Sequence, residues 1–325
     1  MKKTAKGKKL IVMIPCYNEE KTIGKLIKLI PRKIKGINKV EVLVMNDGSK
    51  DNTVKLAKKA GANKIHSHFP NKGLGVNFRR GLEEALGMGG DIVVNIDADL
   101  QFNPKDIPKI VEPILRGEAD VVTATRFAKK ELVPEMPTIK KFGNHFFTKI
   151  ISLLTGQKFT DTQCGFRAYN QEAMLRANLF GKFTYTQEVF LDLINKGMKI
   201  VEVPIRVKGE RDGKSKIVKS WYSYGIKSMM IILRTVRDNH PLKFFGGAGG
   251  ILFLIGFIPG LWLFIRWLAK GITSPYGSLV VLSGVLIILG LLLIVLGLIA
   301  DMLDRQRKIE EEILYEQKKE KFSKR

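Results

Sequence analysis

The chain has 325 residues, and 55 lysines and arginines against 31 aspartates and glutamates give a formal net charge of +24 at pH 7. This length suits one large domain with additions, and the sequence lacks the zinc-ligand, RNP and helix-turn-helix signatures that would link its basic charge to nucleic acid. Attraction to anionic lipid explains the charge more simply, and two cysteines exclude a disulfide framework and indicate a reducing compartment.

Strands and helices alternate along the amino-terminal part of the sequence. Apolar, β-branched runs predict buried strands, and apolar residues at helical spacing predict the helices between them. The expected strands are 10–15, 40–45, 64–68, 92–96 and 120–125, and the expected helices are 22–29, 49 or 51 to 60, 71–86 and 104–115. This order predicts right-handed βαβ units, and therefore an α/β fold with a mostly parallel sheet.

Polar side chains follow the ends of three expected strands. Tyr17 and Glu19 follow the first, Asp47 the second, and Asp97 with Asp99 the strand at 92–96. Because open α/β sheets bind ligands at the carboxyl ends of their strands, we expect these side chains to converge on a site. A turn or a helix cap is the alternative for any single one of them.

The stretch DADLQ at 97–101 is the most informative of these ends. Side chains alternate along an extended chain, so Asp97, Asp99 and Gln101 should point to the same side. Three oxygen ligands suit a hard divalent cation such as Mg²⁺ or Mn²⁺, which would hold a diphosphate. The alternative is a solvent-exposed loop that contains a helix-capping residue.

Beyond Arg126 the pattern loosens into a loop at 129–137, a helix at 140–154, a polar stretch at 161–167, a helix from 187 and a strand ending at 202–204. The turn at 211–216 combines glycine, serine and cations, as phosphate-binding turns do, although a solvated loop is the alternative. A dinucleotide fingerprint at 73–75 is rejected, because it follows the third strand and position 78 is Phe.

Two stretches of the carboxyl-terminal part lack charged residues, between Lys243 and Arg266 and between Lys270 and Asp301. Each exceeds the roughly 20 residues that cross a bilayer. They predict a transmembrane hairpin at 244–303, with spans at about 244–268 and 278–303, and the basic residues on both flanks predict that the large domain and the tail are cytoplasmic. Interfacial amphipathic helices are expected at 217–243, with a buried bundle helix as the alternative, and a charged tail at 304–325.

Eight stretches carry a family resemblance: IPCYNEE (14–20), NDGSKDNT (46–53), NKG (71–73), DADLQ (97–101), TRF (125–127), DTQCGFR (161–167), EVP (202–204) and RDGKSK (211–216). In this order they resemble family-2 glycosyltransferases with the GT-A fold, in the branch of the dolichol-phosphate mannose and glucose synthases. The resemblance covers about 10–216, so a catalytic domain is expected at 1–216.

The resemblance implies roles for individual residues. Pro15, Tyr17, Glu19 and Asp47 would hold the base and ribose of a nucleoside diphosphate sugar. Asp97, Ala98, Asp99 and Gln101 would bind the metal and diphosphate, Arg126 would face the reacting phosphates, and Arg211 with Lys216 would clamp the donor diphosphate.

The acceptor side departs from the family pattern. Where members often carry an arginine for the acceptor phosphate, this chain offers Lys140 and Lys141 beside Arg126, and a lysine supplies a point charge rather than a bidentate fork. A lipid phosphate, with a second pKa near about 6, is already largely ionised at neutral pH and needs no strong general base. The expected reaction is inverting transfer of a hexose from GDP-mannose or a UDP-hexose to a polyprenyl or dolichyl phosphate at the cytoplasmic face.

Two other functions stay open. A processive membrane polysaccharide synthase would usually carry Gln-x-x-Arg-Trp and more membrane helices, whereas this chain has only Arg266-Trp267 within the first span. A membrane scaffold with an inactive transferase fold would have lost carboxylates that are intact here. The choice of sugar, base and polyprenol, and any homo-oligomer, cannot be predicted from the residues.

Overall fold

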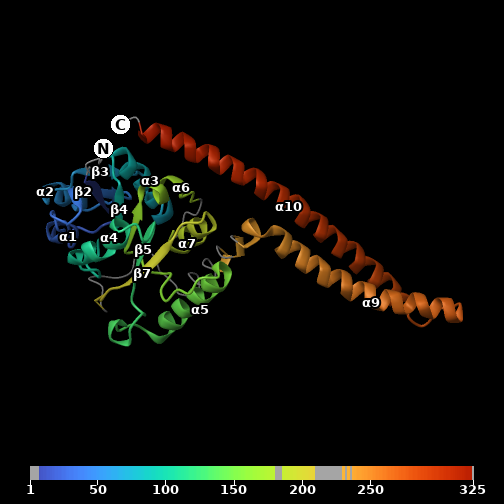
Figure 1. Ribbon diagram of the computed structural model, residues 1–325. Coiled ribbons are helices and arrows are strands. Elements are labelled where there is room, and N and C mark those ends of the chain that lie inside the picture. Colours follow the sequence, from blue (N-terminus) through green and yellow to red (C-terminus); the bar gives the residue numbers. More distant parts are fainter. Residues whose placement is uncertain (1–6, 180–184, 209–228, 231–232, 235, 324–325) are drawn as a thin grey trace. The chain divides into compact units, whose positions relative to one another are not determined.

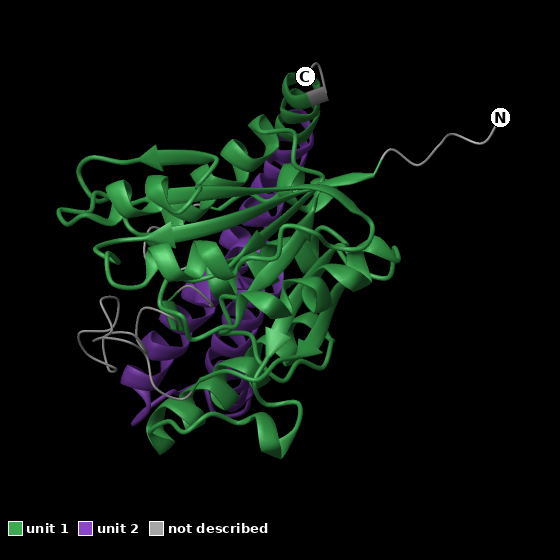
Figure 2. Cartoon of the chain, turned by 90° about the vertical axis from the view of Figure 1, so that its left-hand side faces the viewer, with its two compact units in different colours: residues 1–232, 314–325 green, residues 233–313 purple. Residues whose placement is uncertain are grey.

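The computed structural model describes residues 7–179, 185–208, 229–230, 233–234 and 236–323. The chain forms two compact units, one of Met1–Ile232 with Leu314–Arg325 and one of Leu233–Ile313, which are coloured separately in Figure 2. Each unit is described by itself.

The first unit is built on a seven-stranded sheet of order β3-β2-β1-β4-β6-β5-β7 (Figure 1). Its strands are β1 (Lys8–Cys16), β2 (Ile37–Asn46), β3 (Lys64–Ser67), β4 (Ile92–Asn95), β5 (Val121–Thr125), β6 (Arg167–Asn170) and β7 (Ile200–Pro204). β6 runs antiparallel between β4 and β5, and the other strand pairs are parallel. The predicted mostly parallel sheet is confirmed, and β6 is an addition that the sequence pattern did not indicate.

Helices cover both faces of this sheet. They are α1 (Ile23–Leu29), α2 (Thr53–Lys59), α3 (Leu74–Gly87), α4 (Ile107–Leu115), α5 (Thr138–Thr155), α6 (Gln171–Arg176) and α7 (Thr186–Asn195), with short 3₁₀ turns at Pro104–Asp106 and Lys130–Leu132. Alternate residues of β1 enter different cores, because successive side chains of a strand point to opposite faces. Leu10 and Val12 join the core that contains α1 and α4, and Ile11 and Met13 join the core that contains α3 and α7.

The segment Leu314–Arg325 belongs to the first unit although it follows the second in the sequence. Tyr315 is buried and donates a hydrogen bond to Glu172 (3.0 Å), and the guanidinium of Arg176 lies 4.1 Å from the Tyr315 ring centroid. The Lys318 ammonium donates to the carbonyl oxygens of Leu175 and Ala177 (3.2 Å each) and to Asn178 Oδ1 (2.9 Å). Lys318 thereby satisfies acceptors at the carboxyl end of α6.

The second unit contains α9 (Gly247–Lys270), preceded by a π-helical turn at Leu242–Gly246, and most of α10 (Gly277–Ser323). Both helices are long and apolar enough to cross a membrane. The two helices approach closely at glycines. A Cβ at Gly256 would lie 2.8 Å from Ser283 O and Leu286 Cβ, and one at Gly249 would lie 2.7 Å from Gly290 O. Such contacts between small residues are typical of packed membrane helices.

Candidate active site

The carboxyl ends of the parallel strands meet at one edge of the sheet. β1 and β2 end side by side, with Cys16 paired to Asn46 and the Asp47 amide donating to Cys16 O (2.9 Å). Beside them, the Ile96 amide donates to Met13 O (3.1 Å). The residues that follow these strands, including Tyr17, Asp47 and Asp97, therefore leave the sheet at the same edge.

The loops after β1 and β2 are fastened to each other. The Asn18 amide donates to Ser49 Oγ (2.8 Å), the Lys50 amide to Asn18 Oδ1 (2.8 Å), and the Glu19 amide to Thr53 Oγ1 (2.8 Å). Asn18 adopts a φ of 55°, a left-handed conformation that Asn tolerates better than most residues. Tyr17 and Glu19 thus extend from a loop whose backbone is held on both sides.

Asp47 holds a third loop against this edge. It is buried, and its Oδ1 and Oδ2 accept hydrogen bonds from the amides of Lys72 (2.8 Å) and Gly73 (3.0 Å). Gly73 has a φ of 90°, which favours glycine. The sequence did not reveal this bond to the loop at 71–73, and each carboxylate oxygen retains a further lone pair for a ligand.

The turn after β4 carries Asp97 and Asp99. Asp99 is buried, its Oδ1 accepts from the Gln101 amide (3.1 Å), and Leu100 between them has a φ of 59°. The Gln101 carbonyl accepts from the Lys208 amide (3.1 Å), so the segment after β7 lies against this turn.

Gly165 packs closely against the Asp97 carboxylate, because a Cβ at position 165 would lie 2.9 Å from Asp97 Oδ2. Burial raises the pKa of the Tyr185 phenol well above its usual value, and the nearby Asp97 charge raises it further. Tyr185 in turn meets Asn95 of β4, whose Nδ2 lies 2.8 Å from the phenol oxygen and from Gly165 O.

The donor set of this turn fits a hard divalent cation. It offers two carboxylates and an amide oxygen, and oxygen ligands are those that Mg²⁺ and Mn²⁺ prefer. Among the described residues, no cluster of three or more His, Cys, Asp or Glu side chains is placed to hold a metal ion. The expected metal ligands contain only two residues of these types, Asp97 and Asp99, because the third is Gln101.

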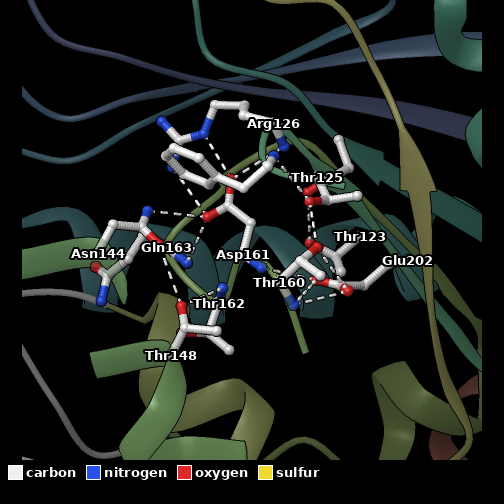
Figure 3. A network of polar contacts seen from close by, with 12 residues as sticks. Thr123, Thr125, Arg126, Asn144, Thr148, Thr160, Asp161, Thr162, Gln163 and Glu202 are labelled. Atoms are coloured by element: carbon white, nitrogen blue, oxygen red, sulfur yellow. Dashed lines mark hydrogen bonds and ion pairs between the residues drawn. The ribbon is translucent and has the colours of Figure 1, made fainter. Parts of the chain in front are cut away.

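Arg126 follows β5 and is held by Asp161 (Figure 3). Its Nε donates to Asp161 Oδ2 (2.6 Å) and its Nη2 to Asp161 Oδ1 (3.0 Å), an arrangement that orients the planar guanidinium. Asp161 is fully buried and also accepts from Asn144 Nδ2 of α5 (3.1 Å) and the Gln163 amide (3.1 Å). Burial by itself raises the pKa of Asp161, but the charge and hydrogen bonds of Arg126, with the Asn144 bond, outweigh it and lower that pKa below its ordinary value.

Glu202 of β7 supports the same loop from the other side. Its carboxylate accepts hydrogen bonds from the backbone amides of Thr160 (2.9 Å) and Asp161 (2.8 Å), as Figure 3 shows. Burial raises the pKa of Glu202, and the neighbouring Asp161 charge raises it further. The hydrogen bonds from Asp161 and Thr160 lower this pKa, but by less, so it lies above its ordinary value. The motifs at 161–167 and 202–204 are therefore parts of one network.

Not every expected site residue is placed at this edge. Lys140 and Lys141 lie exposed in the first turn of α5, and no described contact brings them to Arg126. Arg211 and Lys216 lie outside the described residues. Roles for Asn95 and Asn144 were not predicted from the sequence, although a polar residue within a buried apolar run was a signal for Asn95.

The sequence of this chain is similar to those of known proteins. The model of glycosyl transferase family 2 matches residues 11–176. A UDP-N-acetylglucosamine–dolichyl-phosphate N-acetylglucosaminyltransferase of Methanococcus voltae is 34% identical over 221 residues, covering 61% of this chain and 85% of that protein. A dolichol-phosphate mannosyltransferase of Pyrococcus furiosus is 30% identical over 271 residues, covering 79% of this chain and 73% of that protein.

A solved structure shares the fold. Glucosyl-3-phosphoglycerate synthase from Mycobacterium tuberculosis, in complex with Mn²⁺ and UDP-glucose, superimposes with a TM-score of 0.54 at 22% identity, over 72% of this chain and 79% of that chain. At this identity the likeness establishes a GT-A-like architecture for the first unit.

Proposed function

Because this chain belongs to glycosyl transferase family 2, we propose that it transfers a hexose from a nucleoside diphosphate sugar to a polyprenyl or dolichyl phosphate. Relatives named for transfer to dolichyl phosphate support the acceptor class. The observation that carries the proposal is the arginine held by Asp161 at the sheet edge that also bears Asp97 and Asp99.

The donor would lie along this edge. Pro15, Tyr17, Glu19 and Asp47 would contact the base and ribose, and Asp97, Ala98, Asp99 and Gln101 would hold Mg²⁺ or Mn²⁺ and the diphosphate. The solved relative with Mn²⁺ and UDP-glucose supports this assignment. Arg211 and Lys216 would complete the contacts to the diphosphate.

The reaction we propose is a direct displacement with inversion. An oxygen of the lipid phosphate attacks the anomeric carbon, the bond from that carbon to the donor diphosphate breaks, and the nucleoside diphosphate leaves with the bonding electrons. The bound cation would stabilise charge on the leaving diphosphate. Arg126, fixed by Asp161, would hold the reacting phosphates in line, with Lys140 and Lys141 as further cations for the acceptor, and positioning of this kind supplies much of the rate.

The two apolar helices would keep the transferase domain at the membrane that contains its acceptor. Basic residues on both flanks of the hairpin favour a cytoplasmic location for the transferase domain and for the carboxyl-terminal segment.

A donor screen tests this function. Purified full-length protein is incubated with GDP-mannose, UDP-glucose or UDP-N-acetylglucosamine, a short-chain polyprenyl phosphate, and Mg²⁺ or Mn²⁺. We expect one donor to give a lipid that carries a single sugar, and no product without the lipid phosphate. A long polysaccharide would indicate a processive synthase, and nucleotide-sugar binding without transfer to any acceptor would indicate an inactive scaffold.

A further inference from the structure

Arg266 is a charged residue inside the apolar helix α9. It lies one helical turn before α9 ends at Lys270, and no other charged residue occurs between Lys243 and Lys270. A charged side chain within a membrane helix is costly and is usually paired. An arginine at this position therefore indicates a site whose partner has to be identified.

The distance of Arg266 along α9 places it at the level of lipid headgroups. An α-helix rises 1.5 Å per residue, so the stretch from Lys243 to Arg266 corresponds to about 35 Å. The hydrocarbon core of a bilayer is roughly 30 Å thick. With Lys243 at one boundary of this core, Arg266 lies at the other boundary, where the lipids carry their phosphates.

Two aromatic rings hold the guanidinium of Arg266. Its Cζ lies 5.0 Å from the centroid of the Tyr276 ring and 5.9 Å from that of the Trp262 ring. These two rings meet edge to face, with centroids 5.3 Å apart. Trp262 belongs to α9 and Tyr276 directly precedes α10, so the rings join the two sides of the turn between these helices (Figure 1). We call Trp262, Arg266, Ser274 and Tyr276 the Arg266 cradle.

The cradle uses little of the hydrogen-bonding capacity of Arg266. A guanidinium has five N–H donors. Nη2 donates to Ser274 O at 3.4 Å, which is long for such a bond, and Nε is buried without a hydrogen-bond partner. The sequence contains no acidic residue between Lys243 and Asp301. Asp301 lies about 36 Å along α10 from Gly277, so the described hairpin offers no carboxylate near its turn.

A phosphate complements this arrangement. The planar guanidinium binds phosphate through parallel N–H donors, and the aromatic rings contact its faces rather than competing for these donors. The alternative is that Arg266 only stiffens the turn, as aromatic and long basic residues at membrane interfaces commonly do. Such a role leaves the donors and the charge unmatched.

The distribution of cations in the hairpin also favours a ligand. The turn lies on the side of the two spans opposite to both basic flanks, where the positive-inside bias depletes lysine and arginine. Arg266 is retained there nonetheless. We propose that the Arg266 cradle binds the phosphate of an anionic membrane lipid at the turn of the hairpin. This site lies within the second unit and does not depend on the proposed transfer reaction.

Lys270 provides an internal comparison. It follows Arg266 at the i,i+4 spacing, on the same side of α9, and it carries the same charge. Its side chain is exposed at the end of the helix. General attraction to anionic lipid would use both residues alike, whereas a built site depends on Arg266.

Native mass spectrometry of the purified full-length protein tests the site without any transfer step. The protein in detergent micelles is titrated with phosphatidylglycerol, and the dissociation constant of each bound lipid is measured. We expect wild type to bind one phosphatidylglycerol more tightly than the next, and Arg266→Gln to weaken this first lipid by at least about tenfold. Arg266→Lys should weaken it as well, because lysine keeps the charge but not the planar fork. Lys270→Gln, the matched control, should bind as wild type does.

Three results would overturn the proposal. Equal losses in Arg266→Gln and Lys270→Gln, or full binding by Arg266→Lys, would show general attraction without a built site. Absence of a tightly bound lipid in wild type would exclude the site directly. Displacement of the lipid by inorganic phosphate would mean that the cradle binds a free anion.

A second variant protects the test against misfolding. Tyr276→Leu keeps every charge but removes one ring from the cradle, so it should also weaken the first lipid, and circular dichroism should show unchanged helix content. Unchanged binding by Tyr276→Leu would contradict the cradle. Because no measurement here involves sugar transfer, failure of the lipid site and failure of the proposed function are distinguishable.

Discussion

Arg126 and Asp161 form a two-point ion pair, with Nε–Oδ2 and Nη2–Oδ1 distances of 2.6 Å and 3.0 Å, in which the carboxylate is fully buried and the guanidinium is not. The acid therefore fixes the plane of the arginine from the protein side. The pair explains how a residue at the end of β5 can act as a rigid positive group, as its proposed role beside the reacting phosphates requires.

Asp161→Asn tests this pairing. The amide keeps the size of the side chain but removes the charge, so Arg126 should lose its fixed orientation, and a misplacement of this kind can cost about 10²-fold in rate. We expect kcat to fall by that order, measured with saturating donor and acceptor. Asp106→Asn, which removes only the ion pair with Lys109, is the control. Equal activities of the two variants would show that the orientation of Arg126 is unimportant.

The same pair predicts an acid dependence of stability. Because the pKa of Asp161 is lowered in the folded protein, its ionised form adds stability that is present above the unfolded pKa and is lost as the pH falls through the folded value. Wild type should therefore exceed Asp161→Asn in thermal unfolding midpoint at neutral pH, and the difference should narrow below about pH 4. A difference that is constant from pH 7 to pH 3 would contradict the lowered pKa.

Asp99→Asn tests the proposed cation site. Replacing a carboxylate ligand with an amide weakens cation binding, and the loss of several kcal/mol of charge stabilisation corresponds to at least about 10²-fold in transfer rate. We expect the rate to fall by that amount at limiting Mn²⁺ and to recover partly at high Mn²⁺. Undiminished metal-dependent transfer would rule out the role of Asp99.

Lys318→Met tests the attachment of the carboxyl-terminal segment. Methionine keeps an unbranched apolar chain but removes the donor to three acceptors near the end of α6, and hydrogen bonds to charged groups contribute about 1.5–3 kcal/mol. We expect a lower free energy of unfolding for the first unit, with easier proteolysis after residue 313. Lys319→Met is the control at an exposed neighbouring position. It removes an ion pair with Glu316 (3.4 Å) and a contact of the ammonium with the Tyr315 ring (5.3 Å to the centroid), both at the surface, and should lower the stability much less. If both variants are equally stable, the segment is only loosely attached.

Gly256→Ala tests the close approach of α9 and α10. The added Cβ would lie 2.8–2.9 Å from atoms of Ser283, Leu286 and Ile287, and overpacking costs about 1–3 kcal/mol. Gly250→Ala is the control, because nothing lies within 4 Å of a Cβ there. Circular dichroism during titration with SDS should show earlier loss of the helix pair for Gly256→Ala alone. Identical titrations would mean that the helices separate freely at this point.

Much of the fold followed from local pattern. The apolar runs of β1, β2 and β4 alternate with amphipathic helices, and this periodicity was enough to predict the parallel sheet and the edge at which its polar strand ends meet. β6 was missed for a physical reason. It begins with Arg167, a charged residue that looks exposed in the sequence but is fully buried, donating to the carbonyls of Thr162 and Thr186 (2.8 Å each).

The partners within the site depended on tertiary structure. The motif at 161–167 was recognised as polar and important, but nothing local indicates that Asp161 pairs with Arg126, 35 residues earlier. The sequence predicted a charged tail at 304–325, and in the structure α10 continues through it to Ser323. Tyr315 is buried there only because α6 supplies a surface that the sequence pattern does not disclose.

The late position of Tyr315 and Lys318 has a consequence for biogenesis. Translation proceeds from the amino terminus, so the ribosome makes the whole transferase sheet, then α9 and the apolar part of α10, before it makes the residues of α10 that cover α6. During that interval the surface around Glu172 and Leu175 stays uncovered. Maturation of the enzyme would then be coupled to delivery into the membrane, and a nascent chain stalled before residue 314 would offer that surface to chaperones.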